Sequence, residues 1–376
     1  MPTYRLTIAY DGTDYAGWQK QEPPDPWLRA AEQAAADPGR PPKGGVPNEA
    51  KSMKLEPGLE ARKPGRIALR TVQAVVERAV REVVREPVAL KGASRTDAGV
   101  HARCQIGVFS CSGDVGSDAT TPQPGDRTEP GTDAETDDSR EKGGWPVSRG
   151  AGRLLMAVNS RLPDDVQVVK AEVVPYGFDP ILDCVGKGYS YTLWVGMHRP
   201  LWARRHVHHT WARLNLDAMQ AAATAIVGTH DFAGFAAAGH GRQTTVREVF
   251  DCTVREIEKP ELWHGDHTRG ALGGVVGGRG PVAVADPGRL IRIEVSGSGF
   301  LYNMVRIIAG TLHDVGRGRI DGSQMAEIIA SRERTRGGPT LPAKGLCLEW
   351  VAYPDQTEAK RDGNEGDSEA HTTPEG

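Results

Sequence analysis

Residues 94–102 read Ser-Arg-Thr-Asp-Ala-Gly-Val-His-Ala, and the fold is best worked out from this stretch. An arginine, an aspartate and a histidine lie within a few residues of one another, and Gly92 and Gly99 allow tight turns on either side of Asp97. Strand-like runs flank the stretch, which predicts a loop held by a rigid sheet, where functional residues often gather. Taken alone, Thr-Asp-Ala-Gly is also typical of a plain turn in which Asp97 caps backbone amides.

Outward from this loop, alternating apolar residues predict strands, and apolar residues at helical spacing predict helices. The expected strands are 4–10, 87–90, 105–111, 166–174, 189–195, 245–257, 289–295 and 346–353, and the expected helices are 71–84, 149–162, 216–227, 302–315 and 323–331. The order β-α-β-β-α-β therefore occurs twice. We predict an α+β fold of two pseudo-symmetric ferredoxin-like halves, with a mainly antiparallel sheet and a central active-site cleft.

Segments rich in glycine, proline and charge interrupt this pattern and predict surface insertions and a tail. They cover about residues 22–66, 112–146 and 265–288, and the disordered acidic tail 355–376. We therefore expect an N-terminal half, 1–177, that carries the Asp97 loop, and a C-terminal half, 178–354.

The acidic residues are concentrated in two of these regions. Residues 112–150 hold nine acidic and four basic residues, and residues 355–376 hold seven and two, a net charge of −5 in each. Because the whole chain carries −3, the remainder carries +7. A basic remainder suits a partner that bears phosphates.

The composition excludes several classes of protein. With 38% hydrophobic and 25% charged residues, the chain is typical of a globular protein, and its apolar runs are too short for a membrane span. The first ten residues read as a strand and not as a targeting segment, so we expect a cytoplasmic location by default, with the nucleus or an organelle left open. The five cysteines are scattered and lack a C-x-x-C pair, which predicts neither a disulfide framework nor a zinc site.

Other candidate motifs fail on spacing. The glycine-rich run 273–280 lacks the G-K-[ST] ending of a phosphate-binding loop, and residues 296–299 do not fit the G-x-S-x-G pattern of hydrolases. Four histidines lie among three arginines: His198, His206, His208 and His209 among Arg199, Arg204 and Arg205. Because the arginines would surround any metal with positive charge, we expect a solvated basic segment and no metal site there.

The nine residues 94–102 resemble the signature of the TruA family of tRNA pseudouridine synthases, and the ending Gly-Val-His is similar to the bacterial form. The resemblance continues in the family's order along most of the chain outside the insertions. It is carried by Tyr10-Asp11-Gly12-Thr13, Tyr15, Gly17, Trp18 and Gln19, by Thr71-Val72-Gln73, by residues 159–163 and 228–232, by Phe300, Met304-Val305-Arg306 and Gly310, and by Lys344-Gly345-Leu346.

The resemblance implies an isomerase that converts uridine to pseudouridine at positions 38 to 40 of the tRNA anticodon stem-loop. It implies no metal, redox cofactor or nucleotide, and a homodimer that binds tRNA. Asp97 would be the catalytic residue, and Arg306 would pair with it, because a carboxylate in a closed pocket otherwise tends to become protonated. The remaining site residues would be Tyr189 as the aromatic platform, Arg95 for extruding the base or holding a phosphate, and Phe300 and Leu346 as pocket lining. Apart from the resemblance, Arg306 reads as a surface arginine, Tyr189 as a strand residue, and Phe300 and Leu346 as core.

Departures from the family pattern leave alternatives open. Residues 178–181 read Phe-Asp-Pro-Ile where many relatives have Phe-x-Ala-Arg, residues 187–191 have lost cations, and Ala236 stands where arginine or cysteine is common. These changes put the affinity for RNA and the target in doubt more than the chemistry. A catalytically idle RNA-binding or RNA-folding protein, and a synthase of the same family with another RNA target, are the alternatives. The sequence leaves open whether the carboxylate attacks the sugar, attacks the base or removes a proton.

Overall fold

The computed structural model describes residues 1–25, 54, 64, 66–114, 143–237, 244–258 and 288–354. The predicted insertions 22–66, 112–146 and 265–288 lie largely outside the described residues, and the tail 355–376 lies wholly outside them. All the strands and helices expected from the sequence, and the whole Asp97 loop, lie within the described residues.

The chain order alternates strands and helices twice. The first part comprises β1 (Thr3–Tyr10), α2 (Val72–Val84), β2 (Lys91–Gly92), β3 (His101–Ser110), α3 (Ala151–Asn159) and β4 (Val166–Val174). The second comprises β5 (Gly186–Val195), β6 (His208–Thr210), α4 (Leu216–Thr224), β7 (Gly228–Asp231), β8 (Val246–Ile257), β9 (Arg289–Gly297), α5 (Met304–Gly316), α6 (Met325–Ser331) and β10 (Leu346–Ala352). Short 3-10 turns lie at Gly12–Asp14, Val147–Arg149, Ala233–Phe235, Gly322–Gln324 and Ala343–Gly345.

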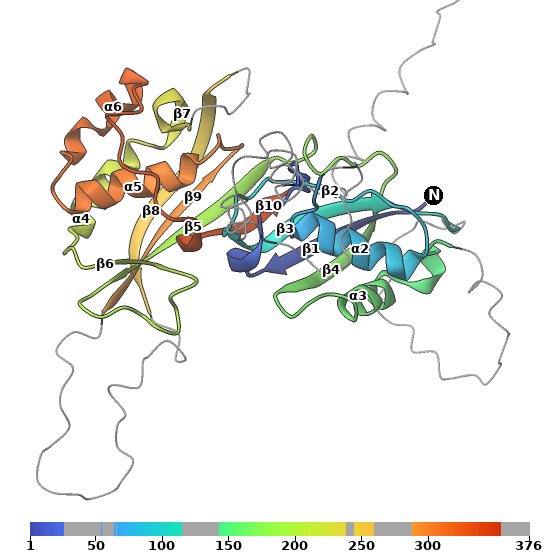
Figure 1. Cartoon of the computed structure of the whole chain (residues 1–376). Coiled ribbons are helices and arrows are strands. Elements are labelled where there is room, and N and C mark those ends of the chain that lie inside the picture. The colour runs from blue at the N-terminus through green and yellow to red at the C-terminus, as the bar shows by residue number, and fades with distance from the viewer. Residues whose placement is uncertain are drawn as a thin grey trace, which may run out of the picture.

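All described strands join one mainly antiparallel sheet in the order β4-β1-β3-β10-β5-β9-β8-β7, with β2 on β3 and β6 on β5. The last strand, β10, lies between the two parts of the chain: it pairs in parallel with β3 and antiparallel with β5. Figure 1 shows α2 and α3 beside the end of the sheet that holds β1 and β4, and α4, α5 and α6 beside the other end. The prediction of an α+β fold with a mainly antiparallel sheet is confirmed.

The first helix illustrates how local sequence and packing agree. Thr71 caps α2, since its hydroxyl accepts a hydrogen bond of 3.4 Å from the amide of Ala74. The valines that recur along one face of α2 are buried against the sheet: Val72, Val75, Val76 and Val80. Burial of each such side chain contributes about 1.5–3 kcal/mol, so the helix is stabilised mainly by this face.

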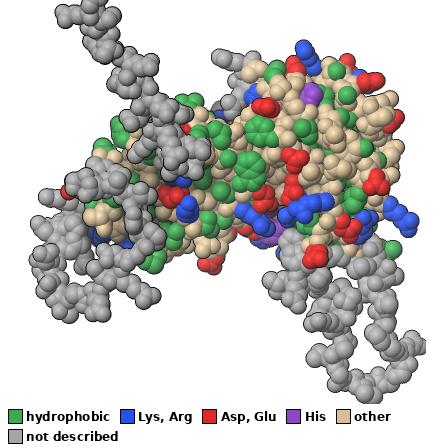
Figure 2. Space-filling model, turned by 180° about the vertical axis from the view of Figure 1, so that it is seen from behind, with side chains coloured by type: hydrophobic (Ala, Val, Ile, Leu, Met, Phe, Trp, Pro, Cys, Tyr) green, Lys and Arg blue, Asp and Glu red, His purple; other side chains and the backbone are tan. Residues whose placement is uncertain are grey.

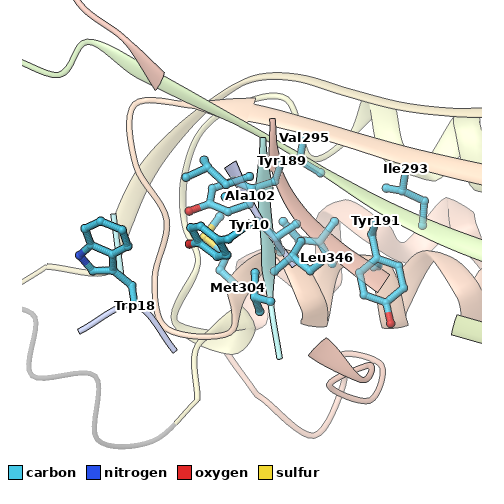
Figure 3. Packing of buried hydrophobic residues seen from close by; sticks show 14 of the residues in the cluster. Tyr10, Trp18, Ala102, Tyr189, Tyr191, Ile293, Val295, Met304 and Leu346 are labelled. Atoms are coloured by element: carbon cyan, nitrogen blue, oxygen red, sulfur yellow. The ribbon is translucent and has the colours of Figure 1, made fainter. Parts of the chain in front are cut away.

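The core continues across the junction formed by β10. Tyr189 and Tyr191 on β5 lie opposite Leu348 and Leu346 on β10, and all four are buried. Figure 3 shows Tyr10 from β1, Ala102 from β3 and Tyr189 from β5 grouped together near Leu346. The two parts of the chain therefore share one hydrophobic core at the centre of the sheet.

The strand predicted at 87–90 is wrong, because this stretch has no strand structure and the short β2 begins one residue later. Side chains of α2 satisfy the backbone groups that a strand would have offered to the sheet. Arg81 donates to the carbonyl oxygen of Val88, Glu77 accepts from the amide of Leu90, and Gln73 donates to the carbonyl oxygen of Leu90. The apolar alternation came from Val88 and Leu90 being buried under the helix.

Two short strands, β6 and β7, were not predicted, and helix α5 begins two residues later than expected.

Figure 2 shows acidic, basic and apolar side chains intermixed over the visible face of the molecule. Among the described residues, none of the helices combines the length and the apolar character that crossing a membrane requires.

Candidate active site

The loop that carries Asp97 joins β2 to β3, and it packs against the end of β1 and the turn after it. The amide of Trp18 donates to the carbonyl oxygen of Thr96 at 3.0 Å, and the hydroxyls of Tyr10 and Thr96 share a hydrogen bond of 2.7 Å. Gly12 packs so closely that a Cβ there would lie 1.8 Å from the carbonyl oxygen of Val100. The opening segment therefore holds the loop in place.

A buried glutamine fixes the start of the loop. The side chain of Gln105 is fully buried, its amide donates to the carbonyl oxygen of Ser94 at 2.7 Å, and its Oε1 accepts from the amide of Ser94 at 3.1 Å. At the other end, the amide of Val100 donates to the carbonyl oxygen of Asp97 at 3.1 Å. The Asp97 side chain is thus presented by a loop whose backbone is hydrogen-bonded on both sides.

Asp97 meets Arg306 from the other part of the chain. Nη1 of Arg306 lies 3.3 Å from Oδ2 of Asp97, and the two side chains are 17% and 24% exposed, respectively. Arg306 lies in the first turn of α5 and is held by two further bonds, from Nε to the carbonyl oxygen of Leu341 and from Nη1 to Oδ1 of Asn303, both 2.7 Å. Three acceptors therefore fix one guanidinium.

The electrostatics of Asp97 reflect two opposing effects. Burial raises the pKa of the Asp97 carboxyl above its usual value, because a charged group loses hydration there, while the Arg306 guanidinium lowers it. Burial is the larger effect. Arg306 therefore limits a shift that would otherwise leave more of the carboxyl protonated.

Tyr189 lies near enough to Asp97 for the carboxylate charge to act on its phenol. Its hydroxyl shares a hydrogen bond of 2.8 Å with Oγ of Ser94, and its ring contacts Phe300 edge to face with centroids 5.3 Å apart. Burial, aided by the nearby charge of Asp97, raises the pKa of the Tyr189 phenol to about 12, so it stays protonated at neutral pH. Figure 3 shows Tyr189 lying next to Tyr10.

The remaining predicted site residues differ in their surroundings. Leu346 is the first residue of β10, is 6% exposed, and pairs with Tyr191 in the sheet register. Phe300 is half-buried against Tyr189. Arg95 is exposed and forms no hydrogen bond or ion pair with any other described residue. The structure thus brings Asp97, Arg306, Tyr189 and Phe300 together, with Arg95 at the surface of the same loop.

Asp11, His101 and His206 also converge, where the Asp97 loop meets β3, with ligand atoms within 4.8 Å of one another. Their contacts fit a hydrogen-bonded junction. Nδ1 of His101 accepts from the amide of Gly12 at 3.1 Å, and Nε2 lies 3.0 Å from the carbonyl oxygen of Arg205. Oδ1 of Asp11 is also 3.1 Å from Nδ1, an approach that becomes an ion pair when His101 is protonated. Since both ring nitrogens of His101 already have partners, the arrangement does not favour a metal.

Sequence reasoning missed the residues beside this junction. Arg204 and Lys344 line a cavity with Gly99, although they are far apart in the sequence. A cluster of arginines around residue 204 was the available signal, and it was interpreted as a solvated segment because a charge run has the same appearance whether or not it faces a site.

The comparisons with known proteins identify the family. A family model described as tRNA pseudouridine synthase matches residues 222–354, which include Arg306 but not Asp97. Over 353 residues, which cover 94% of this chain and 100% of each relative, the chain is 32% identical to tRNA pseudouridine synthase A of Pelobacter propionicus. Over the same coverage it is 31% identical to the proteins of that name from Geobacter sulfurreducens and Ruminiclostridium cellulolyticum. The chain belongs to the TruA family of tRNA pseudouridine synthases.

Proposed function

We propose that this protein converts uridine to pseudouridine in the anticodon stem-loop of tRNA, with the carboxylate of Asp97 as the catalytic group. The reaction breaks the bond between N1 of uracil and C1′ of ribose and forms a bond between C5 and C1′. C5 loses its hydrogen and N1 gains one, so substrate and product have the same atoms. Membership of a family of tRNA isomerases supports the reaction, and the Asp97–Arg306 pair supports the catalytic group.

The chemistry requires an ionised carboxylate close to the sugar and the base. Attack on the sugar, attack on the base and removal of a proton all need the charged form of Asp97. Burial opposes that form, and Arg306 favours it. The ion pair therefore carries the proposal, because it places a charge-balanced carboxylate in a partly closed site.

The uridine must leave its stack to reach Asp97, and a flipped base needs an apolar or aromatic surface to replace its neighbours. Tyr189 and Phe300 supply two rings in contact, and Leu346 lies on β10, the strand that pairs with the strand of Tyr189. We assign the uracil to this surface. We assign to Arg95, which is exposed on the same loop, contact with a phosphate or filling of the space that the base leaves.

The test is to incubate the purified protein with unmodified tRNA and to map pseudouridine at single-nucleotide resolution. Asp97→Asn is the decisive variant, because it removes the charge and keeps the shape, and Asp217→Asn at an exposed position in α4 is the matched control. We expect product from the wild type and from Asp217→Asn, and a fall by a factor of at least about 10³ for Asp97→Asn.

Full activity of Asp97→Asn would refute the assignment of the catalytic group. Binding of tRNA by the wild type without any product would instead favour a catalytically idle RNA-binding protein. Product at uridines outside the anticodon stem-loop would favour another RNA target within the same reaction.

We further propose that residues 1–177 and 178–354 are two ferredoxin-like halves related by pseudo-symmetry, and that two chains form a homodimer. The strand orders β4-β1-β3-β2 and β10-β5-β9-β8 support the first proposal, because each follows the same path through its four strands. The homodimer rests on the family resemblance alone. Light scattering on the purified protein would distinguish one chain from two.

A further inference from the structure

A cavity of about 500 Å³ opens beside the loop that carries Asp97. Its lining comes from three parts of the chain: Thr13 and Gly99, then Arg199, Leu201, Arg204 and Arg205, and finally Lys344. We call residues 198–206, which connect β5 to β6, the basic segment. The cavity lies where the basic segment meets the first part of the chain.

Positive charge dominates this lining. Of its four cations, Arg205 pairs with Asp14 at 3.1 Å. Within the described part of the chain, Arg199, Arg204 and Lys344 have no carboxylate partner, and Arg204 donates only to the carbonyl oxygen of Leu201 at 2.8 Å. Cations that converge on a hollow without acidic partners attract an anion, and an oxyanion accepts hydrogen bonds from several of them at once.

The basic segment is fixed to the sheet by its own small core. Ala203 in the segment and Val207 directly after it are 1% and 0% exposed, respectively, and pack with Trp194 of β5 and Leu290 of β9. Nε1 of Trp194 donates to the carbonyl oxygen of His198 at 3.0 Å. The cations therefore extend from a backbone that is already ordered, which lowers the entropy cost of binding a ligand.

The basic segment is also fixed to the first part of the chain. Nε2 of His101 lies 3.0 Å from the carbonyl oxygen of Arg205, and the rings of His101 and His206 are 4.7 Å apart. His101 is the first residue of β3, directly after the Asp97 loop. The basic segment is thereby held beside the loop that carries Asp97.

We propose that this cavity binds a backbone phosphate of the RNA substrate, next to the nucleotide whose base reaches Asp97. The inference rests on the proposed function. Gly99 lines the cavity and follows Asp97 by two residues, which span at most about 7 Å of chain. A nucleotide in the active site carries a phosphate on each side, so one RNA strand can place a base near Asp97 and a phosphate in the cavity. Trp202, 76% exposed in the same segment, adds a ring on which an unstacked base can lie.

The experiment compares the wild type with the double variant Arg204→Gln plus Lys344→Gln, and with Arg153→Gln in α3 as the matched control. Affinity for unmodified tRNA is measured over a series of salt concentrations, and the rate of pseudouridine formation is measured at saturating tRNA. Arg153 is exposed and does not line the cavity. Thermal unfolding of each variant verifies that it is folded.

For the double variant, we expect the Kd for tRNA to rise about tenfold and the slope of log affinity against log salt to become shallower by about one. Most of the loss should appear in binding and little in the rate at saturation. An unchanged Kd and slope, in a preparation whose wild type forms pseudouridine, would overturn the cavity assignment. Absence of product from the wild type would instead count against the proposed function.

Discussion

Arg306 contacts Asp97 itself, and Arg204 lines a cavity beside the loop that carries Asp97, but the two arginines have opposite surroundings. Arg306 is mostly buried, and its guanidinium contacts a carboxylate, an amide oxygen and a backbone carbonyl oxygen. Arg204 is exposed, and the guanidinium donates to one carbonyl oxygen. A buried cation whose hydrogen bonds are satisfied lowers the pKa of a neighbouring carboxyl. An exposed cation attracts an anionic ligand from solution, and this attraction weakens as salt increases. We therefore expect Arg306 to affect catalysis and Arg204 to affect the binding of RNA.

The largest effect that tests this contrast is expected for Arg306→Gln. Removal of the cation leaves burial unopposed, so the pKa of Asp97 rises further. Activity that needs the carboxylate is present above this pKa and is lost as pH falls through it. We expect the rate at neutral pH to fall by about 10²-fold and the acid limb of the pH–rate profile to move to higher pH. An unshifted acid limb would show that Arg306 does not influence the catalytic carboxyl.

A second prediction concerns the support beneath the loop. Gly12→Ala places a methyl group 1.8 Å from the carbonyl oxygen of Val100, so backbone must move. We expect a loss of about 1–3 kcal/mol in the free energy of unfolding, measured with urea, together with reduced activity. Gly152→Ala is the matched control, because nothing lies within 4 Å of its new methyl group and it lies in helix α3. That control should gain up to about 1 kcal/mol. Equal stability of the two variants would contradict the close packing.

The smallest effect is expected for Tyr189→Phe, which keeps the ring and removes the hydroxyl that contacts Ser94. The free energy of unfolding should fall by about 1 kcal/mol, with the rate changed less than in Arg306→Gln. A double-mutant cycle with Ser94→Ala isolates the pair, since the two losses should not add. Additive losses would mean that the hydroxyls act independently.

Much of the fold was predictable because it follows local patterns. Residues 166–169 of the edge strand β4 alternate between buried and exposed side chains, and the apolar spacing of residues 72–84 is that of a helix with one buried face. The prediction of a strand at 87–90 was wrong because side chains of α2 bind the backbone there. An alternating pattern of apolar residues gives no sign of such a contact. The position of β10 between β3 and β5 is a pairing over long sequence separation, which periodicity cannot reveal.

Some residues of the site could likewise be predicted from the sequence, and others could not. Asp97 and Arg306 are 209 positions apart, and only the family resemblance predicted that they meet. Arg204 was missed because the basic segment has no periodic pattern, and Lys344 was noted only as part of the family motif. Their convergence with Gly99 depends on how the segment is held by His101 and by its small core.

The most direct test of this division measures tRNA affinity and single-turnover pseudouridine formation side by side for Asp97→Asn and for Arg204→Gln plus Lys344→Gln. We predict that Asp97→Asn binds tRNA within about threefold of the wild type and forms no product, since it loses no contact with phosphate. The double variant should bind about tenfold more weakly and still convert bound tRNA. If both variants failed to convert tRNA at saturation and both kept the affinity of the wild type, the result would contradict our claim that Asp97 serves catalysis and that Arg204 and Lys344 serve tRNA binding.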